Sequence, residues 1–165
     1  MKFGGGVLET YAECVWVEIP TSDGFNFLVG NYYFPPLFDD VEFVEHFETV
    51  QKKVDFSKFR VLIYGNFNLP GIDWSTGVAS CSSSVTSRKA CWLLSFIIFF
   101  DFHQYNALAN SHGNVLDLCL SNAPLDPTIP AANPLVPVDA YHPPFKTKFC
   151  LSCRPRVNRS SAAYC

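Results

Sequence analysis

The residues best placed to do chemistry follow a short apolar run in the middle of the chain. The run Val61–Tyr64 ends at Gly65, and Asn66 and Asn68 then come before a Pro-Gly turn. This order is typical of a buried strand that delivers polar side chains to the rim of a sheet. An amide side chain can coordinate a cation through its oxygen, but it carries no charge and cannot act as a base.

Metal-assisted cleavage of a phosphodiester places fixed demands on such a rim. Acidic oxygens hold a hard cation such as Mg2+, which polarises the phosphoryl oxygen and steadies the leaving oxygen. A base or a water-orienting group serves the nucleophile, and a histidine held by a carboxylate stabilises the developing charge or relays a proton. These groups come from separate strand ends, so they are expected as scattered short motifs.

The stretch 65–74, Gly-Asn-Phe-Asn-Leu-Pro-Gly-Ile-Asp-Trp, resembles a signature of the endonuclease/exonuclease/phosphatase family, Gly-Asp-Phe-Asn-Leu-Pro-x-Ile-Asp-Trp. Its Leu-Pro-x-Ile-Asp-Trp part is similar to the endonuclease domain of non-LTR retrotransposons. The resemblance covers about residues 13–144. It implies an α/β fold, namely part of an α/β sandwich with mixed sheets and outer helices whose N-terminal part is missing. It also implies cleavage of DNA, Mg2+ as cofactor, and an original fusion to a reverse transcriptase domain.

The resemblance gives four side chains a catalytic role. Tyr33 matches the Tyr-x-Pro element that lies beside the scissile phosphate, and Asn68 matches the second polar residue of Gly-Asp-Phe-Asn, which orients water and phosphate. Asp117 matches the late Leu-Asp segment, in which the Asp orients the catalytic His. His142 stands where the family closes with Ser-Asp-His and would be that His.

Two further positions match metal-site residues in a degenerate form. Asn66 replaces the family's metal-binding Asp, and Asp139 stands three residues before His142 instead of next to it, as a weak candidate ligand. No glutamate near the N-terminus occupies the family's metal-binding Glu motif. We therefore expect a truncated, degenerate copy in which Mg2+ binding and DNA cleavage are impaired. The alternative is a catalytically inactive α/β fragment that binds nucleic acid or protein, and a phosphatase for a small ligand is a third hypothesis.

The hydrophobic pattern predicts the elements that must position these residues. An amphipathic helix is expected to begin near Asp39 and Asp40 and to cover a sheet, and a second helix is expected over 88–100. Asp23-Gly24 is a hairpin turn signal between the first two strands. Residues 80–87 are expected to form a Ser/Thr-rich loop, and the proline-rich region 124–144 an extended one. The expected strands cover 14–19, 26–33, 61–64, 104–108, 115–121 and 146–151.

Length and composition favour one domain over 13–150, between an irregular N-terminus at 1–12 and a basic tail at 151–165. Apolar residues make up 48% and charged residues 16% of the chain, which excludes global disorder. The net charge of −3 gives no overall basic footprint for nucleic acid. A site that holds phosphate through a metal needs less basic surface, so DNA is not excluded as a partner. The basic tail is either a solvated segment or one that contacts a nucleic-acid backbone.

The seven cysteines are odd in number and scattered, and no secretory signal precedes them, so reduced intracellular thiols are expected. The resemblance implies that a functional copy would act in the nucleus. The pair Cys150 and Cys153 lacks the second pair that a zinc site needs. The apolar run 92–100 is shorter than the ~20 residues of a spanning helix, so no membrane segment is expected.

Overall fold

The computed structural model describes residues 13–74, 80–81, 87–135 and 137–149. Both segments that the sequence places outside the domain, residues 1–12 and 151–165, lie beyond these residues. So do the CxxC cysteines, Cys150 and Cys153. Cys14, Cys91 and Cys119 are present as thiols. Within the described part of the chain, no helix is long and apolar enough to cross a membrane.

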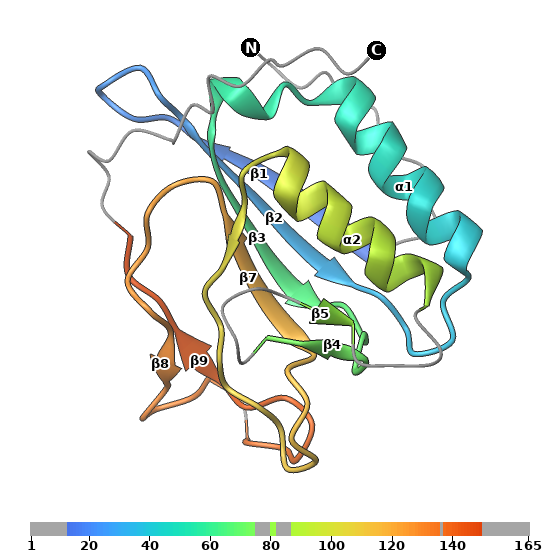
Figure 1. Cartoon of the computed structure of the whole chain (residues 1–165). Helices are drawn as coiled ribbons and strands as arrows, with labels where there is room; N and C mark the ends of the chain where they lie inside the picture. Colours follow the sequence, from blue (N-terminus) through green and yellow to red (C-terminus); the bar gives the residue numbers. More distant parts are fainter. Residues whose placement is uncertain (1–12, 75–79, 82–86, 136, 150–165) are drawn as a thin grey trace.

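A five-stranded mixed sheet forms the centre of the molecule (Figure 1). The two neighbouring strands β2 and β3 run parallel, and the other neighbours in this sheet run antiparallel. A mixed sheet with helices is the α/β class that the sequence predicts. In spatial order its strands are β1 (Glu13–Ile19), β2 (Phe27–Tyr33), β3 (Arg60–Asn66), β7 (Asp117–Ser121) and β6 (His103–Gln104).

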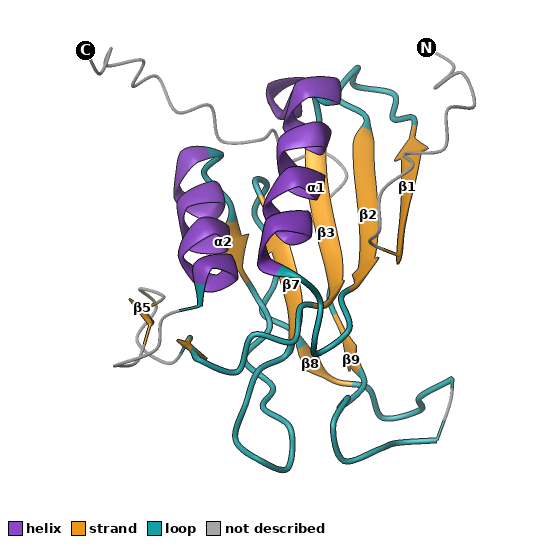
Figure 2. Cartoon of the chain, turned by 90° about the vertical axis from the view of Figure 1, so that its right-hand side faces the viewer, coloured by secondary structure: helices purple, strands orange, loops and turns teal. Residues whose placement is uncertain are grey.

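Two helices, α1 (Asp40–Lys53) and α2 (Arg88–Phe99), cover the same face of this sheet (Figures 1 and 2). Both helices occur where the pattern predicts them, and each has a side-chain N-cap. Asp39 accepts the N–H groups of Val41 and Glu42, and Ser87 Oγ accepts the N–H of Ala90. The 3-10 helix η1 (Phe56–Lys58) leads from α1 into β3.

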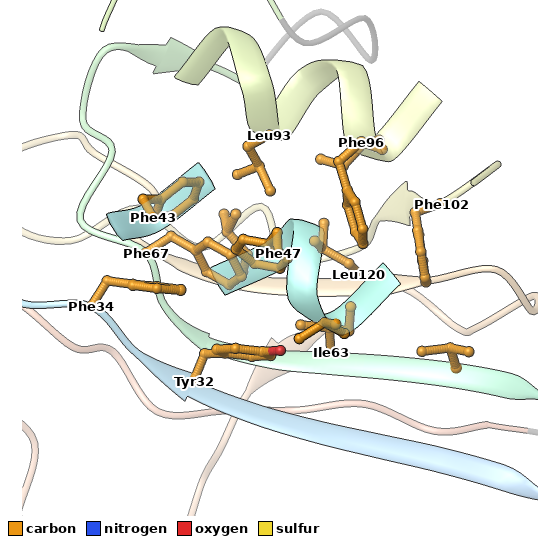
Figure 3. Packing of buried hydrophobic residues seen from close by; sticks show 14 of the residues in the cluster. Tyr32, Phe34, Phe43, Phe47, Ile63, Phe67, Leu93, Phe96, Phe102 and Leu120 are labelled. Carbon is orange, nitrogen blue, oxygen red and sulfur yellow. The ribbon is translucent and has the colours of Figure 1, made fainter. Parts of the chain in front are cut away.

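Aromatic rings fill the space between the helices and the sheet (Figure 3). Phe47 of α1 is fully buried, and its ring packs on Tyr32 and Phe34 from the β2 side and on Phe96 from α2. Phe67, which follows β3, joins the same cluster. The many phenylalanines of the sequence therefore build the layer that fixes the helices on the sheet.

Three predicted segments differ from the structure. The strand expected over 104–108 is only the two-residue β6, because the Gln104 side chain bonds the backbone of Asn106 and turns the chain away. The strand expected over 146–151 is replaced by the short β9 (Phe145–Lys146), which pairs with β8 (Ile129–Pro130), and residues 150–151 of the prediction lie outside the described residues. The Ser/Thr-rich loop expected over 80–87 begins with a strand, β5 (Ser80–Cys81), paired with β4 (Ile72–Asp73), and residues 82–86 lie outside the described residues.

Candidate functional site

Three of the predicted side chains lie in one row across the sheet. Tyr33 is the register partner of Asn66, and Asn66 is the register partner of Asp117. Residues directly opposite one another share a face of the sheet. Their neighbours Tyr32 and Leu118 belong to the core under the helices, so the row faces away from the helices. We call this row, with the loops beside it, the rim.

Gly65 allows β3 to reach the rim beside β2. Its φ of +142° is one that residues with a side chain rarely adopt. A Cβ at this position would lie 1.9 Å from the carbonyl oxygen of Tyr32. The glycine that opens the motif is therefore required by backbone packing, and it places Asn66 next to Tyr33.

The two asparagines of the motif hold each other and the neighbouring strand. Asn66 Oδ1 accepts the N–H of Asn68 at 2.9 Å, and Asn68 Nδ2 donates to the carbonyl of Phe34 at 2.7 Å. Asn68 has a φ of 48°, a left-handed conformation that asparagine tolerates better than most residues. The amide oxygen of Asn66 is thus engaged within the loop, and Asn68 ties the end of β3 to the end of β2.

Asp117 and His142 are in direct contact. His142 Nδ1 lies 3.0 Å from Asp117 Oδ2 and 3.4 Å from Oδ1. The Asp117 side chain is 18% exposed and that of His142 43% exposed. Burial raises the pKa of the Asp117 carboxyl above its ordinary value, and the bond to His142 opposes this rise. The predicted contact is present, and it leaves Nε2 as the ring nitrogen that does not face Asp117.

Asn106 supports Asp117 from the backbone, a contact that the sequence does not reveal. It is buried, and its Nδ2 donates to the Asp117 carbonyl at 2.7 Å. Its Oδ1 accepts the N–H of Leu108 and the hydroxyl of Thr128. The bonds to Asp117 and Thr128 join segments that lie far apart in sequence, so no local pattern could have indicated them.

Glu13 stands at the end of the same row. It is the register partner of Tyr33 and lies on the edge strand β1, two strands from Asn66. The Asp23-Gly24 turn signal indicates the hairpin between β1 and β2, and the register that brings 13 opposite 33 comes from the structure.

A groove of about 350 Å³ lies beside the rim. Its walls include Ile72 of β4 and Trp74, which follows β4, and Asn114 and Val115 from the loop before β7. The end of the recognised motif therefore forms one wall of this groove.

The rim does not form a cage for Mg2+. Among residues 13–74, 80–81, 87–135 and 137–149, no three or more His, Cys, Asp or Glu side chains are grouped so as to hold a metal ion. The oxygen of Asn66 accepts a backbone N–H, and the carboxylate of Asp117 holds His142. Mg2+ prefers octahedral oxygen ligands, usually including one or two carboxylates. The carboxylates of the described residues are dispersed, and that of Asp117 already bonds another side chain.

Comparison with known protein families found no matching family model, and comparison with curated proteins found no match. Among solved structures, the chain is similar to the endonuclease domain of TRAS1, a telomere-specific non-LTR retrotransposon. The identity is 16% and the TM-score 0.46, with 68% of this chain and 54% of that domain covered. The chain thus spans about half the length of that domain. A likeness of this size assigns neither a family nor an activity.

Proposed function

We propose that the chain is a retroelement-derived, endonuclease-like domain whose rim binds a phosphate of DNA but cleaves the phosphodiester poorly or not at all. The contact between Asp117 and His142, in the row that holds Tyr33 and Asn66, carries this proposal. The resemblance of residues 65–74 to retrotransposon endonucleases favours DNA over a small phosphorylated ligand. The same resemblance supports an original fusion to a reverse transcriptase domain.

In this proposal His142 is the group that meets the phosphate. Asp117 accepts a hydrogen bond from Nδ1–H, so Nε2 is the ring nitrogen that points away from the carboxylate. An imidazolium so placed donates to a phosphate oxygen and stabilises negative charge that develops there. Tyr33, which is partly exposed at the end of β2, has a hydroxyl that can donate to the same group.

The impairment follows from the missing carboxylates. When bound, a divalent cation would supply Lewis-acid polarisation of the phosphoryl group. Asn66 is uncharged, and its oxygen already accepts the N–H of Asn68. Loss of a single electrostatic group from such a site lowers the reaction rate by a factor of about 10²–10³. The site can then still bind phosphate, but it hydrolyses the phosphodiester inefficiently.

A second candidate is a catalytically inactive domain that binds nucleic acid or protein through another surface. The hydrogen bond from the N–H of Asn68 to the amide oxygen of Asn66 favours this candidate, because it gives Asn66 a structural role in its own loop. The two candidates differ in whether phosphate meets His142.

Two measurements on the purified chain test the proposal. In the first, supercoiled plasmid is incubated with Mg2+, with and without a chelator, and we expect little or no nicking. In the second, thymidine 5′-monophosphate is titrated while the histidine ring signals are followed by NMR. We expect the His142 signals to shift, and the signals of His112, an exposed histidine in a neighbouring loop, to shift less.

Robust, chelator-sensitive nicking that His142→Ala abolishes would show an active endonuclease and overturn the impairment. An unchanged His142 spectrum at saturating nucleotide would overturn phosphate binding at the rim and leave the second candidate.

A further inference from the structure

We propose that Asp139 is a positioning residue for His142: its carboxylate fixes the backbone turn that presents the imidazole to Asp117. This role differs from the metal-ligand role that the sequence resemblance suggests. The catalytic meaning of the inference rests on the proposed function, whereas its geometry can be tested without activity.

The first observation is the way Asp139 bonds to the turn. Its Oδ1 accepts the N–H of Tyr141 and the N–H of His142, each at 2.7 Å. These two bonds hold the pKa of the Asp139 carboxyl below its ordinary value, with the bond from His142 the larger cause. An Asp that accepts from its own backbone two and three residues further on mimics a backbone turn. The side chain therefore defines the path of residues 139–142.

The second observation is that the turn is anchored on both sides of His142. The carbonyl of Ala140 accepts the N–H of Ser111 at 3.0 Å, and the carbonyl of Pro144 accepts the N–H of Ala131 at 2.9 Å. Pro143 directly follows His142 and restricts its backbone to extended conformations. Between these anchors, Asp139 supplies the hydrogen-bond acceptor at the backbone N–H of His142 itself.

The third observation concerns the His142 side chain, which is 43% exposed. A ring that is partly exposed is less constrained by packing than a buried one, so the backbone of His142 and the bond to Asp117 contribute to its position. With the backbone of His142 held, Nδ1 lies 3.0 Å from Asp117 Oδ2. The charge of Asp139 also reaches Asp117, where it contributes to the raised pKa of that carboxyl.

Replacement by asparagine separates a positioning role from a ligand role. Asp139→Asn keeps Oδ1 as an acceptor for both N–H groups but removes the charge and the second carboxylate oxygen. Asp139→Ala removes the acceptor as well. Asp126→Ala is the matched control, because Asp126 is an exposed aspartate on the loop before β8.

The experiment records the 15N-edited NMR signal of the His142 Nδ1–H in the full chain without ligand, assigned with His142→Ala. In the native chain we expect a hydrogen-bonded Nδ1–H. The signal should persist in Asp139→Asn and Asp126→Ala and be lost or averaged in Asp139→Ala, while backbone amide signals of the central sheet stay in place. The same variants are titrated with thymidine 5′-monophosphate, and we expect affinity to fall by about tenfold in Asp139→Ala alone.

Three results would overturn the inference: a persisting signal in Asp139→Ala, a loss in Asp139→Asn equal to that in Asp139→Ala, or a loss in Asp126→Ala. A persisting signal in Asp139→Ala would show that the turn forms without Asp139. An equal loss in Asp139→Asn would show that the charge of Asp139 matters and not its role as hydrogen-bond acceptor. A loss in Asp126→Ala would show that the effect is not specific to position 139. If the nucleotide does not bind but Asp139→Ala still loses the Nδ1–H signal, the proposed function fails and the positioning role stands.

Discussion

The two faces of the central sheet use the same strands for opposite purposes. On the helix-covered face, Tyr32 and Ile63 pack into an aromatic layer with Phe47 at its centre. On the other face at the end of the strands, the adjacent residues Tyr33 and Asn66 stand in a polar row. One face is held by apolar burial, and the rim is held by hydrogen bonds between side chains and loop backbone.

This contrast predicts which substitutions affect stability and which affect the site. A substitution in the aromatic layer is expected to lower the free energy of unfolding and to leave the geometry of the rim unchanged. A substitution in the rim is expected to change the orientation of His142 and to leave the free energy of unfolding nearly unchanged.

The largest effect is expected at the centre of the aromatic layer. Phe47→Ala should lower the free energy of unfolding by about 3–5 kcal/mol, because it removes a fully buried ring and leaves a cavity. Denaturant unfolding measures this difference. Phe99→Ala is the control, since Phe99 is 78% exposed on α2, and it should change the value by less than about 0.5 kcal/mol. Equal losses in both variants would mean that the layer is not the main source of stability.

A somewhat smaller, pH-dependent effect is expected at His46, which is buried in the same layer. Neither ring nitrogen has a hydrogen-bond partner among the described residues, and burial lowers the pKa of His46 from 6.5 to about 4. The unfolded chain therefore binds the proton first, and stability falls as the pH drops from about 6.5 to about 4. The loss from this group should reach about 3 kcal/mol at pH 4.

Comparison of the native chain with His46→Phe isolates that contribution. The difference in unfolding free energy between the two proteins should be constant above pH 7 and should change in favour of the variant as the pH falls to 4. Phe99→Ala, at an exposed position without a titrating group, should keep the native pH profile. A His46→Phe profile parallel to the native one would show that His46 is protonated without cost in the folded state.

The smallest effect on stability is expected at the rim. Burial raises the pKa of Asp117, so its ionised form costs stability at every pH above its unfolded value. Asp117→Asn removes that charge and should leave the free energy of unfolding at pH 7 within about 0.5 kcal/mol of the native value. The same change should move the hydrogen-bonded Nδ1–H signal of His142, because a neutral acceptor replaces a charged one. A large loss of stability with an unchanged His142 signal would reverse the contrast between the two regions.

The sequence predicts the elements that follow a regular hydrophobic period. The helix after Asp39 and the strand around Val61–Tyr64 were predicted correctly because apolar periodicity and capping are local signals. The contact of Asp117 with His142 was predicted from a family resemblance. Local patterns could not predict how Asn106 holds Asp117, since that bond spans eleven residues and depends on the finished sheet.

The short strands show the same limit. The length of β6 depends on the turn that Gln104 makes with the backbone of Asn106. The role of Asp139 likewise depends on whether its carboxylate bonds its own backbone or binds a cation. The position of Asp139 three residues before His142 is compatible with either role.

The most direct test of the account is DNA nicking by Asn66→Asp in Mg2+, compared with the native chain and with His142→Ala. The variant restores the family carboxylate, but it places that carboxylate opposite Asp117 and leaves the rest of the ligand set unchanged. We predict no chelator-sensitive nicking above the level of His142→Ala, because one carboxylate does not make a Mg2+ site at this rim. Robust nicking by Asn66→Asp that the chelator stops would contradict the account and show that position 66 is the sole defect.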